Sequence, residues 1–143
     1  MSPVSPKPDN GALPRHVLLV EDDPILALDI IDTLKAAGVA EVQHRITTDE
    51  ALIALREATP DVVILDVHLA DRDDGWAIAE LVRTLLPHPP RIIFSTGAPE
   101  AIPEEIAEMG PVLEKPYDGA DLVALIREPI KRGIFSRLKG VIR

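Results

Sequence analysis

Side chains able to bind a cation or a phosphoryl group follow four apolar segments of this chain. An acidic triplet at residues 21–23 follows the first segment, and Asp66 ends the second. Thr96 follows the third, and Lys115 follows the fourth. Carboxylates that crowd together repel one another, and a hard divalent cation such as Mg²⁺ would neutralise them. An ammonium and a hydroxyl beside that cation would suit a phosphoryl group, with Asp66 as its nucleophilic acceptor.

The apolar segments have the length and composition of buried strands, and helical patterns separate them. Strands are expected at residues 16–20, 39–46, 61–66, 92–95 and 112–114. Helices are expected at residues 24–37, 48–58, 76–86 and 118–127, with at most a short helix in the proline-interrupted span 97–110. Alternation at this spacing is typical of βαβ units, so the fold class is α/β: a doubly wound, five-stranded parallel sheet with helices on both faces.

In such a sheet the residues that follow the strands gather at one edge, where ligands bind. Some of the acidic residues at this edge could instead have a purely structural role. Asp23, next to Pro24, is better explained as the N-cap of the first helix, with Gly38 as its end. A cap accounts for at most one acid of the triplet, so Glu21 and Asp22 are kept as site residues.

Composition excludes several function classes. The chain has 143 residues, about the length of one domain, with 24 acidic against 15 basic side chains and a net charge of -9. An acidic chain repels phosphate backbones, so nucleic-acid binding is not expected. There is no cysteine, which excludes disulfides and thiolate chemistry. No apolar run approaches the roughly 20 residues that span a bilayer, so the protein is expected to be cytoplasmic without stable membrane insertion.

Three regions are expected. Residues 1–14 hold four of the 14 prolines and are predicted to be a disordered leader. Residues 15–128 form the folded domain. Residues 129–143 form a basic tail with apolar residues at helical spacing, and two interpretations of it stay open. It packs locally as a frayed extension, or it contacts a partner, an anionic membrane surface or the domain's own acidic face.

Four motifs resemble the receiver domain of two-component response regulators, in the same order as in that family. They lie at residues 17–23, 63–67, 94–97 and 114–116. The resemblance implies a flavodoxin-like sheet of order 2-1-3-4-5 and identifies Asp66 as the phosphoacceptor. It further implies that Mg²⁺ is held by four residues, namely Glu21, Asp22, Asp66 and the main-chain carbonyl of His68.

The remaining two roles follow from the same resemblance. Thr96 matches the switch hydroxyl and Lys115 the phosphate-binding lysine. Residues 111–113 depart from the pattern, since receivers often carry there an aromatic residue that moves with the threonine. This departure and the proline-interrupted span 97–110 resemble a subgroup named for a Phe-Ala-Thr-Gly signature, which is typically stand-alone and often paired with kinases of the HWE type.

The function expected from these features is that of a single-domain response regulator, a signalling protein rather than an enzyme. A sensor histidine kinase would phosphorylate Asp66 in a Mg²⁺-dependent reaction, and output would pass through protein contacts or end in a phosphate sink or relay. The downstream partner stays unknown, and a homodimer stays open. One alternative is an aspartyl-nucleophile phosphohydrolase, although His68 stands where such enzymes carry a second Asp. The other is a pseudo-receiver that only binds partners.

Overall fold

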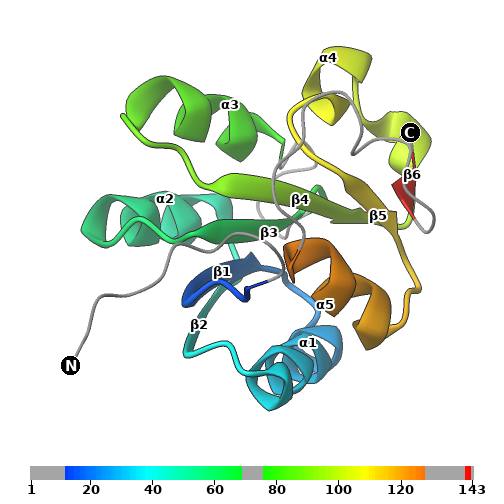
Figure 1. Cartoon of the computed structure of the whole chain (residues 1–143). Coiled ribbons are helices and arrows are strands. Elements are labelled where there is room, and N and C mark those ends of the chain that lie inside the picture. Colours follow the sequence, from blue (N-terminus) through cyan, green and yellow to red (C-terminus); the bar gives the residue numbers. More distant parts are fainter. Residues whose placement is uncertain (1–11, 69–75, 128–140, 143) are drawn as a thin grey trace.

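The computed structural model describes residues 12–68, 76–127 and 141–142. Its centre is a sheet of order β2-β1-β3-β4-β5-β6 (Figure 1). The strands are β1 (His16–Val20), β2 (Glu41–Arg45), β3 (Val62–Asp66), β4 (Arg91–Thr96), β5 (Val112–Glu114) and β6 (Val141–Ile142). The first five are parallel, which confirms the predicted order 2-1-3-4-5, and β6 pairs antiparallel with β5.

Helices cover both faces of the sheet, as expected for a doubly wound fold. One face carries α1 (Pro24–Ala37) and α5 (Gly119–Arg127), and the other carries α2 (Thr48–Glu57), α3 (Ala77–Leu85) and α4 (Glu104–Ala107) (Figure 1). A 3-10 turn, η1 (Pro99–Ala101), precedes α4. Strands β1, β3 and β4 send alternate side chains into the two hydrophobic cores, so each is buried along nearly its whole length.

The first helix begins and ends where its capping residues predict. The Asp23 carboxylate accepts hydrogen bonds from the amides of Ile25 and Leu26, and Pro24 occupies the first helical position. Gly38 ends the helix with φ of 118°, a left-handed conformation that glycine adopts without a steric penalty. The Asp23 carboxylate is therefore occupied as the N-cap of α1, whereas Glu21 and Asp22 do not cap this helix.

The connection between β4 and β5 contains little regular structure. It holds only η1 and the four-residue α4, neither of which has a side-chain N-cap. Ile102 and Ile106 anchor it to the core that lies under α2 and α3. The sequence expectation of at most a short helix over residues 97–110 agrees with this arrangement.

The structure differs from the sequence expectations at both ends of the domain. Leu13 packs against the core beneath α1, and Pro14 is buried, so the ordered part begins before residue 15. Residues 1–11 of the predicted leader, and residues 128–140 and 143 of the tail region, lie outside the described residues. Val141, one of the apolar residues at helical spacing in the predicted tail, lies instead in β6 and pairs with Leu113, because the edge of β5 offers backbone groups for pairing.

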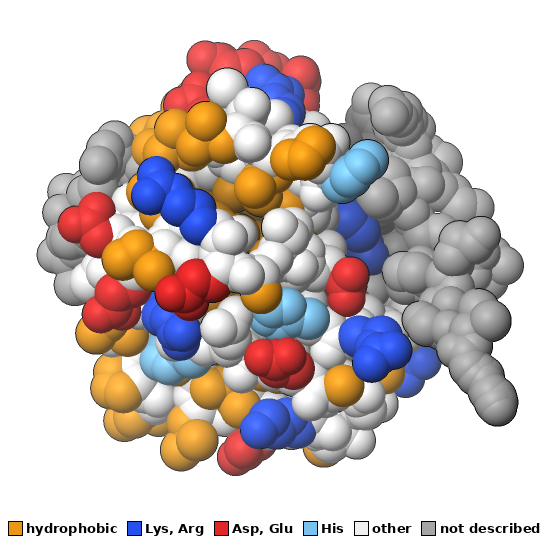
Figure 2. All heavy atoms as spheres, turned by 90° about the vertical axis from the view of Figure 1, so that its left-hand side faces the viewer, with side chains coloured by type: hydrophobic (Ala, Val, Ile, Leu, Met, Phe, Trp, Pro, Cys, Tyr) orange, Lys and Arg blue, Asp and Glu red, His pale blue; other side chains and the backbone are white. Residues whose placement is uncertain are grey.

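The surface of the described residues carries mixed charge. On the face shown in Figure 2, acidic and basic side chains are interspersed among scattered hydrophobic ones, without a continuous basic area on the described part of that face. Within the described residues, the helices are too short or too polar to cross a membrane.

Candidate functional site

Three carboxylates meet where β1 and β3 end. The two strands are register neighbours, with Val20 beside Leu65, so the residues that follow Val20 lie next to Asp66. Glu21, Asp22 and Asp66 each offer one oxygen within 4.8 Å of the others. Glu21 and Asp66 are buried, at 1% and 4% exposed, and Asp22 is half-buried. The structure therefore brings together the acidic residues that the sequence placed at one edge.

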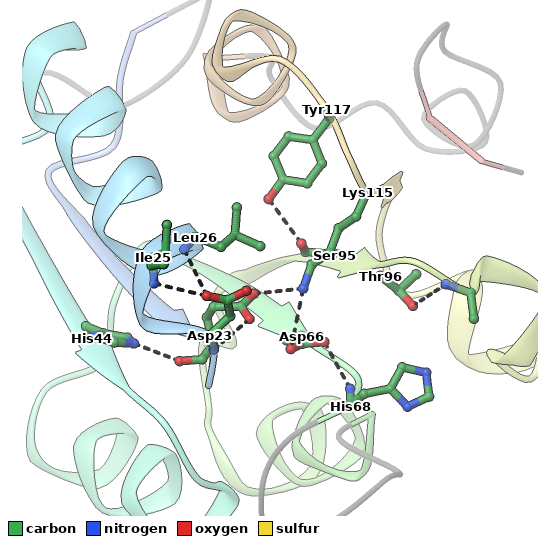
Figure 3. A network of polar contacts seen from close by, with 12 residues as sticks. Asp23, Ile25, Leu26, His44, Asp66, His68, Ser95, Thr96, Lys115 and Tyr117 are labelled. Carbon is green, nitrogen blue, oxygen red and sulfur yellow. Dashed lines mark hydrogen bonds and ion pairs between the residues drawn. The ribbon is translucent and has the colours of Figure 1, made fainter.

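A single ammonium bridges two of these carboxylates. Lys115 Nζ lies 3.0 Å from Glu21 Oε1 and 3.5 Å from Asp66 Oδ2 (Figure 3). Lys115 follows β5, and its amide donates a 2.7 Å hydrogen bond to the carbonyl of Thr96 on β4. The peptide bond from Lys115 to Pro116 is cis. Two of the three carboxylates thus share the Lys115 ammonium as a positive partner.

Burial and this crowding raise the pKa values of both buried acids. Burial, and secondarily the charge of Asp66, raises the pKa of Glu21 to about 7, although Lys115 acts in the opposite direction. Burial also raises the pKa of Asp66 above its usual range. For Lys115, burial alone would lower the pKa, but the hydrogen bond to Glu21 and the two negative charges outweigh it and raise the pKa. The site therefore holds its negative charge at a free-energy cost that a bound cation would relieve.

Backbone groups hold the acidic side chains in place. The amide of His68 donates to Asp66 Oδ1 at 3.0 Å, and the amide of Asp23 donates to Glu21 Oε2 at 3.1 Å. His44 Nε2, on β2, donates to the carbonyl of Glu21 at 2.7 Å. The structure thus places His68 beside Asp66 through its amide, and the metal-binding role of its carbonyl stays a prediction.

Thr96 lies on the strand next to Asp66, but its hydroxyl is turned away from it. The hydroxyl accepts a 2.9 Å hydrogen bond from the amide of Ala98, as Figure 3 shows, and the side chain is buried. In this conformation the hydroxyl is engaged by the Ala98 amide, and its role as the switch hydroxyl stays a prediction. The physical reason is local, since a threonine hydroxyl readily bonds to the amide two residues on at a strand end.

The sequence did not predict a contact made by Tyr117, which lies two residues after Lys115. The hydroxyl groups of Ser95 and Tyr117 lie 3.0 Å apart, and Ser95 is the register partner of Asp66. Residues 111–113, which precede the lysine, include no aromatic residue. The available signal was an aromatic residue two positions after the lysine, together with a hydroxyl directly before Thr96.

The donor set fits a hard divalent cation. Carboxylate oxygens are the ligands that Mg²⁺ prefers, and it commonly takes one or two of them together with water and phosphate oxygens. Glu21, Asp22 and Asp66 supply such oxygens around one point, with more negative charge than Lys115 balances. Within the described residues, a bound Mg²⁺ would be held by these three side chains.

Comparison with known proteins agrees with this geometry. The family model of the response regulator receiver domain matches residues 17–127. This chain belongs to the response regulator receiver domain family. The site just described lies within the matched residues. Membership of the subgroup with the Phe-Ala-Thr-Gly signature stays a prediction.

Individual relatives are similar over most of this chain. The transcriptional regulatory protein PdtaR of Mycobacterium tuberculosis is 26% identical over 86% of this chain and 60% of its own length. The phyllosphere-induced regulator PhyR of Methylorubrum extorquens is 29% identical over 80% of this chain and 43% of its own. The chain thus spans about half the length of these curated relatives.

Solved structures show the same fold. A CheY-like receiver domain from Methylobacillus flagellatus superposes with a TM-score of 0.68 at 26% identity, covering 76% of this chain and 92% of that one. The anti-anti-sigma factor PhyR of Bartonella quintana superposes with a TM-score of 0.64 at 26% identity, covering 78% and 45%. Both agree with the α/β architecture of Figure 1.

Proposed function

We propose that this receiver accepts a phosphoryl group from a sensor histidine kinase onto Asp66 in a Mg²⁺-dependent reaction. The observation that carries the proposal is the shared position of Asp66 Oδ2, the Lys115 ammonium and two further carboxylates. A carboxylate kept only for structure needs one partner. A cluster with excess negative charge suits binding of a cation together with an anionic phosphoryl group.

The proposed transfer uses Asp66 as the nucleophile. One of its carboxylate oxygens forms a bond to phosphorus while the bond from phosphorus to the kinase imidazole nitrogen breaks, and the electron pair remains on that nitrogen. Lys115, whose Nζ lies 3.5 Å from Asp66 Oδ2, would stabilise the negative charge on the phosphoryl oxygens bonded next to it. A Mg²⁺ ion held by Glu21, Asp22 and Asp66 would supply further neutralisation of that charge.

The signal would follow from a change at Thr96. An aspartyl phosphate carries roughly 1.5 to 2 negative charges in place of the single charge of the Asp66 carboxylate, and it adds new acceptor oxygens beside β4. The Thr96 hydroxyl would leave the Ala98 amide and donate to one of these oxygens. Loss of the 2.9 Å bond to Ala98 would release the start of η1 and α4, which are already short.

The output is proposed to pass through protein contacts of the region formed by β4, α4 and β5, or to end in a phosphate sink or relay. A protein-contact output agrees with the role of the similar PhyR of Bartonella quintana as an anti-anti-sigma factor. The resemblance to the subgroup with the Phe-Ala-Thr-Gly signature favours a kinase of the HWE type as the phosphoryl donor. Formation of a homodimer is likewise a proposal.

The test is phosphorylation by a small donor. The protein is incubated with Mg²⁺ and phosphoramidate, and its intact mass is measured. We expect one hydroxylamine-labile phosphoryl group per chain, absent in Asp66→Asn and retained in the exposed-site control Asp29→Asn. Rapid multiple turnover of phosphate esters would instead identify a phosphohydrolase. No adduct and no Mg²⁺ binding would identify a pseudo-receiver and overturn the proposal.

A further inference from the structure

Tyr117 connects the segment after β5 to the strand beside the phosphoacceptor. It is the sole tyrosine of the chain, and its hydroxyl lies 3.0 Å from that of Ser95 (Figure 3). Ser95 is 1% exposed and is the register partner of Asp66. The tyrosine ring packs against the core beneath α1 and α5. Tyr117 thus reaches the immediate neighbour of Asp66.

The segment from Lys115 to Tyr117 is fastened to β4 at two points. At its start the Lys115 amide donates to the Thr96 carbonyl at 2.7 Å, and at its end Tyr117 bonds to Ser95. Burial raises the pKa of Tyr117 further above neutrality, so its hydroxyl keeps the proton that lets it donate to, or accept from, the Ser95 hydroxyl. Lys115 lies at the start of this doubly fastened segment.

We propose that Tyr117 is a positioning residue for Lys115, acting through its hydrogen bond to Ser95. A lysine has a flexible four-carbon stem, so its ammonium stays between two carboxylates only if the backbone that carries it is fixed. The bond between Tyr117 and Ser95 supplies that fixation on the C-terminal side of Lys115. The inference deepens the proposed function, since Lys115 is there assigned to the phosphoryl group.

The first experiment measures Lys115 directly and does not depend on phosphorylation. Brief acylation with acetic anhydride is followed by peptide mass mapping, and the labelling rate of Lys115 is compared with that of the exposed Lys35. Removing the bond by Tyr117→Phe or Ser95→Ala should raise the relative rate about two- to tenfold. The double variant should match the single variants, because both substitutions remove the same bond.

A matched control and the double variant separate positioning from general destabilisation. Thr84→Val removes a hydroxyl that donates to the Glu80 carbonyl on the exposed side of α3, and it should leave Lys115 labelling unchanged. Tyr117→Phe leaves the buried Ser95 hydroxyl unpaired, whereas the double variant does not, so the double variant should be the more stable of the two. The inference would be overturned if the labelling rate of Lys115 did not change in the single variants. It would also be overturned if the increase in the double variant equalled the product of the two single increases.

The second experiment measures phosphorylation of the same proteins by phosphoramidate and Mg²⁺. Tyr117→Phe and Ser95→Ala should each slow adduct formation about two- to tenfold relative to the unsubstituted protein and to Thr84→Val. An unchanged rate in these variants, with the unsubstituted protein phosphorylated normally, overturns the positioning role. If the unsubstituted protein forms no adduct, the proposed function fails instead, and the labelling of Lys115 alone decides the role of Tyr117.

Discussion

Replacing Asp66 by asparagine should stabilise the metal-free protein at alkaline pH. At an effective dielectric constant of about 20, two charges 4.8 Å apart repel by about 3.5 kcal/mol. Asp66 has two such charges, on Glu21 and Asp22, within this distance, and thus at least about 7 kcal/mol of repulsion. Its attraction to Lys115 at 3.5 Å is about 4.7 kcal/mol, so the net electrostatic cost of the Asp66 charge is at least about 2 kcal/mol. The isosteric amide removes this charge and keeps an oxygen that can accept from the His68 amide.

The assay is thermal unfolding in EDTA and in saturating Mg²⁺, followed by circular dichroism. In EDTA at about pH 8, Asp66→Asn should unfold about 5–10 °C higher than the unsubstituted protein. Mg²⁺ should raise the melting temperature of the unsubstituted protein much more than that of the variant, because the variant lacks one ligand. As Glu21 takes up a proton below about pH 7, the gain in EDTA should shrink.

The exposed Asp29→Asn serves as the control and should change the melting temperature little under any of these conditions. The reasoning is refuted if Asp66→Asn lowers stability in EDTA at alkaline pH, or if it behaves like Asp29→Asn.

Three further predictions concern the cation, the switch and the connection between β4 and β5. Because the pKa of Glu21 is about 7 and its carboxylate must be charged to bind metal, Mg²⁺ affinity should fall up to tenfold per pH unit below that value and level off above it. Calorimetric titration at several pH values measures this, and a pH-independent affinity would contradict the assignment. Thr96→Val should lower the free energy of unfolding by about 1 kcal/mol, since the Ala98 amide loses its acceptor, and urea titration showing no loss would count against that bond. Amide hydrogen exchange should be faster over residues 97–110 than in β1, and strong protection there would exclude a movable segment.

Much of the fold could be predicted because its signals are local. The buried strands appear as apolar segments, and Asp23 and Gly38 mark the ends of α1 through their own capping chemistry. The meeting of Glu21, Asp22 and Asp66 also followed from topology, since parallel strands end at one edge.

The rest depended on side-chain direction, which residue order does not determine. Thr96 is in the predicted place, yet its hydroxyl accepts from the Ala98 amide, a donor only two residues away in the chain. The bond between Ser95 and Tyr117 needed the register of β4 and the path of the chain after Lys115. Strand β6 depended on which open sheet edge lay within reach of Val141.

The most direct test of the central claim is the chemical position of the phosphoryl group. After phosphorylation by phosphoramidate with Mg²⁺, borohydride reduces an aspartyl phosphate to homoserine, and peptide mass mapping locates the changed residue. The account predicts homoserine at position 66 alone and none when Mg²⁺ is withheld with EDTA. Reduction at Asp22 or at another acidic residue, or an unmodified Asp66 in the presence of Mg²⁺, would contradict it.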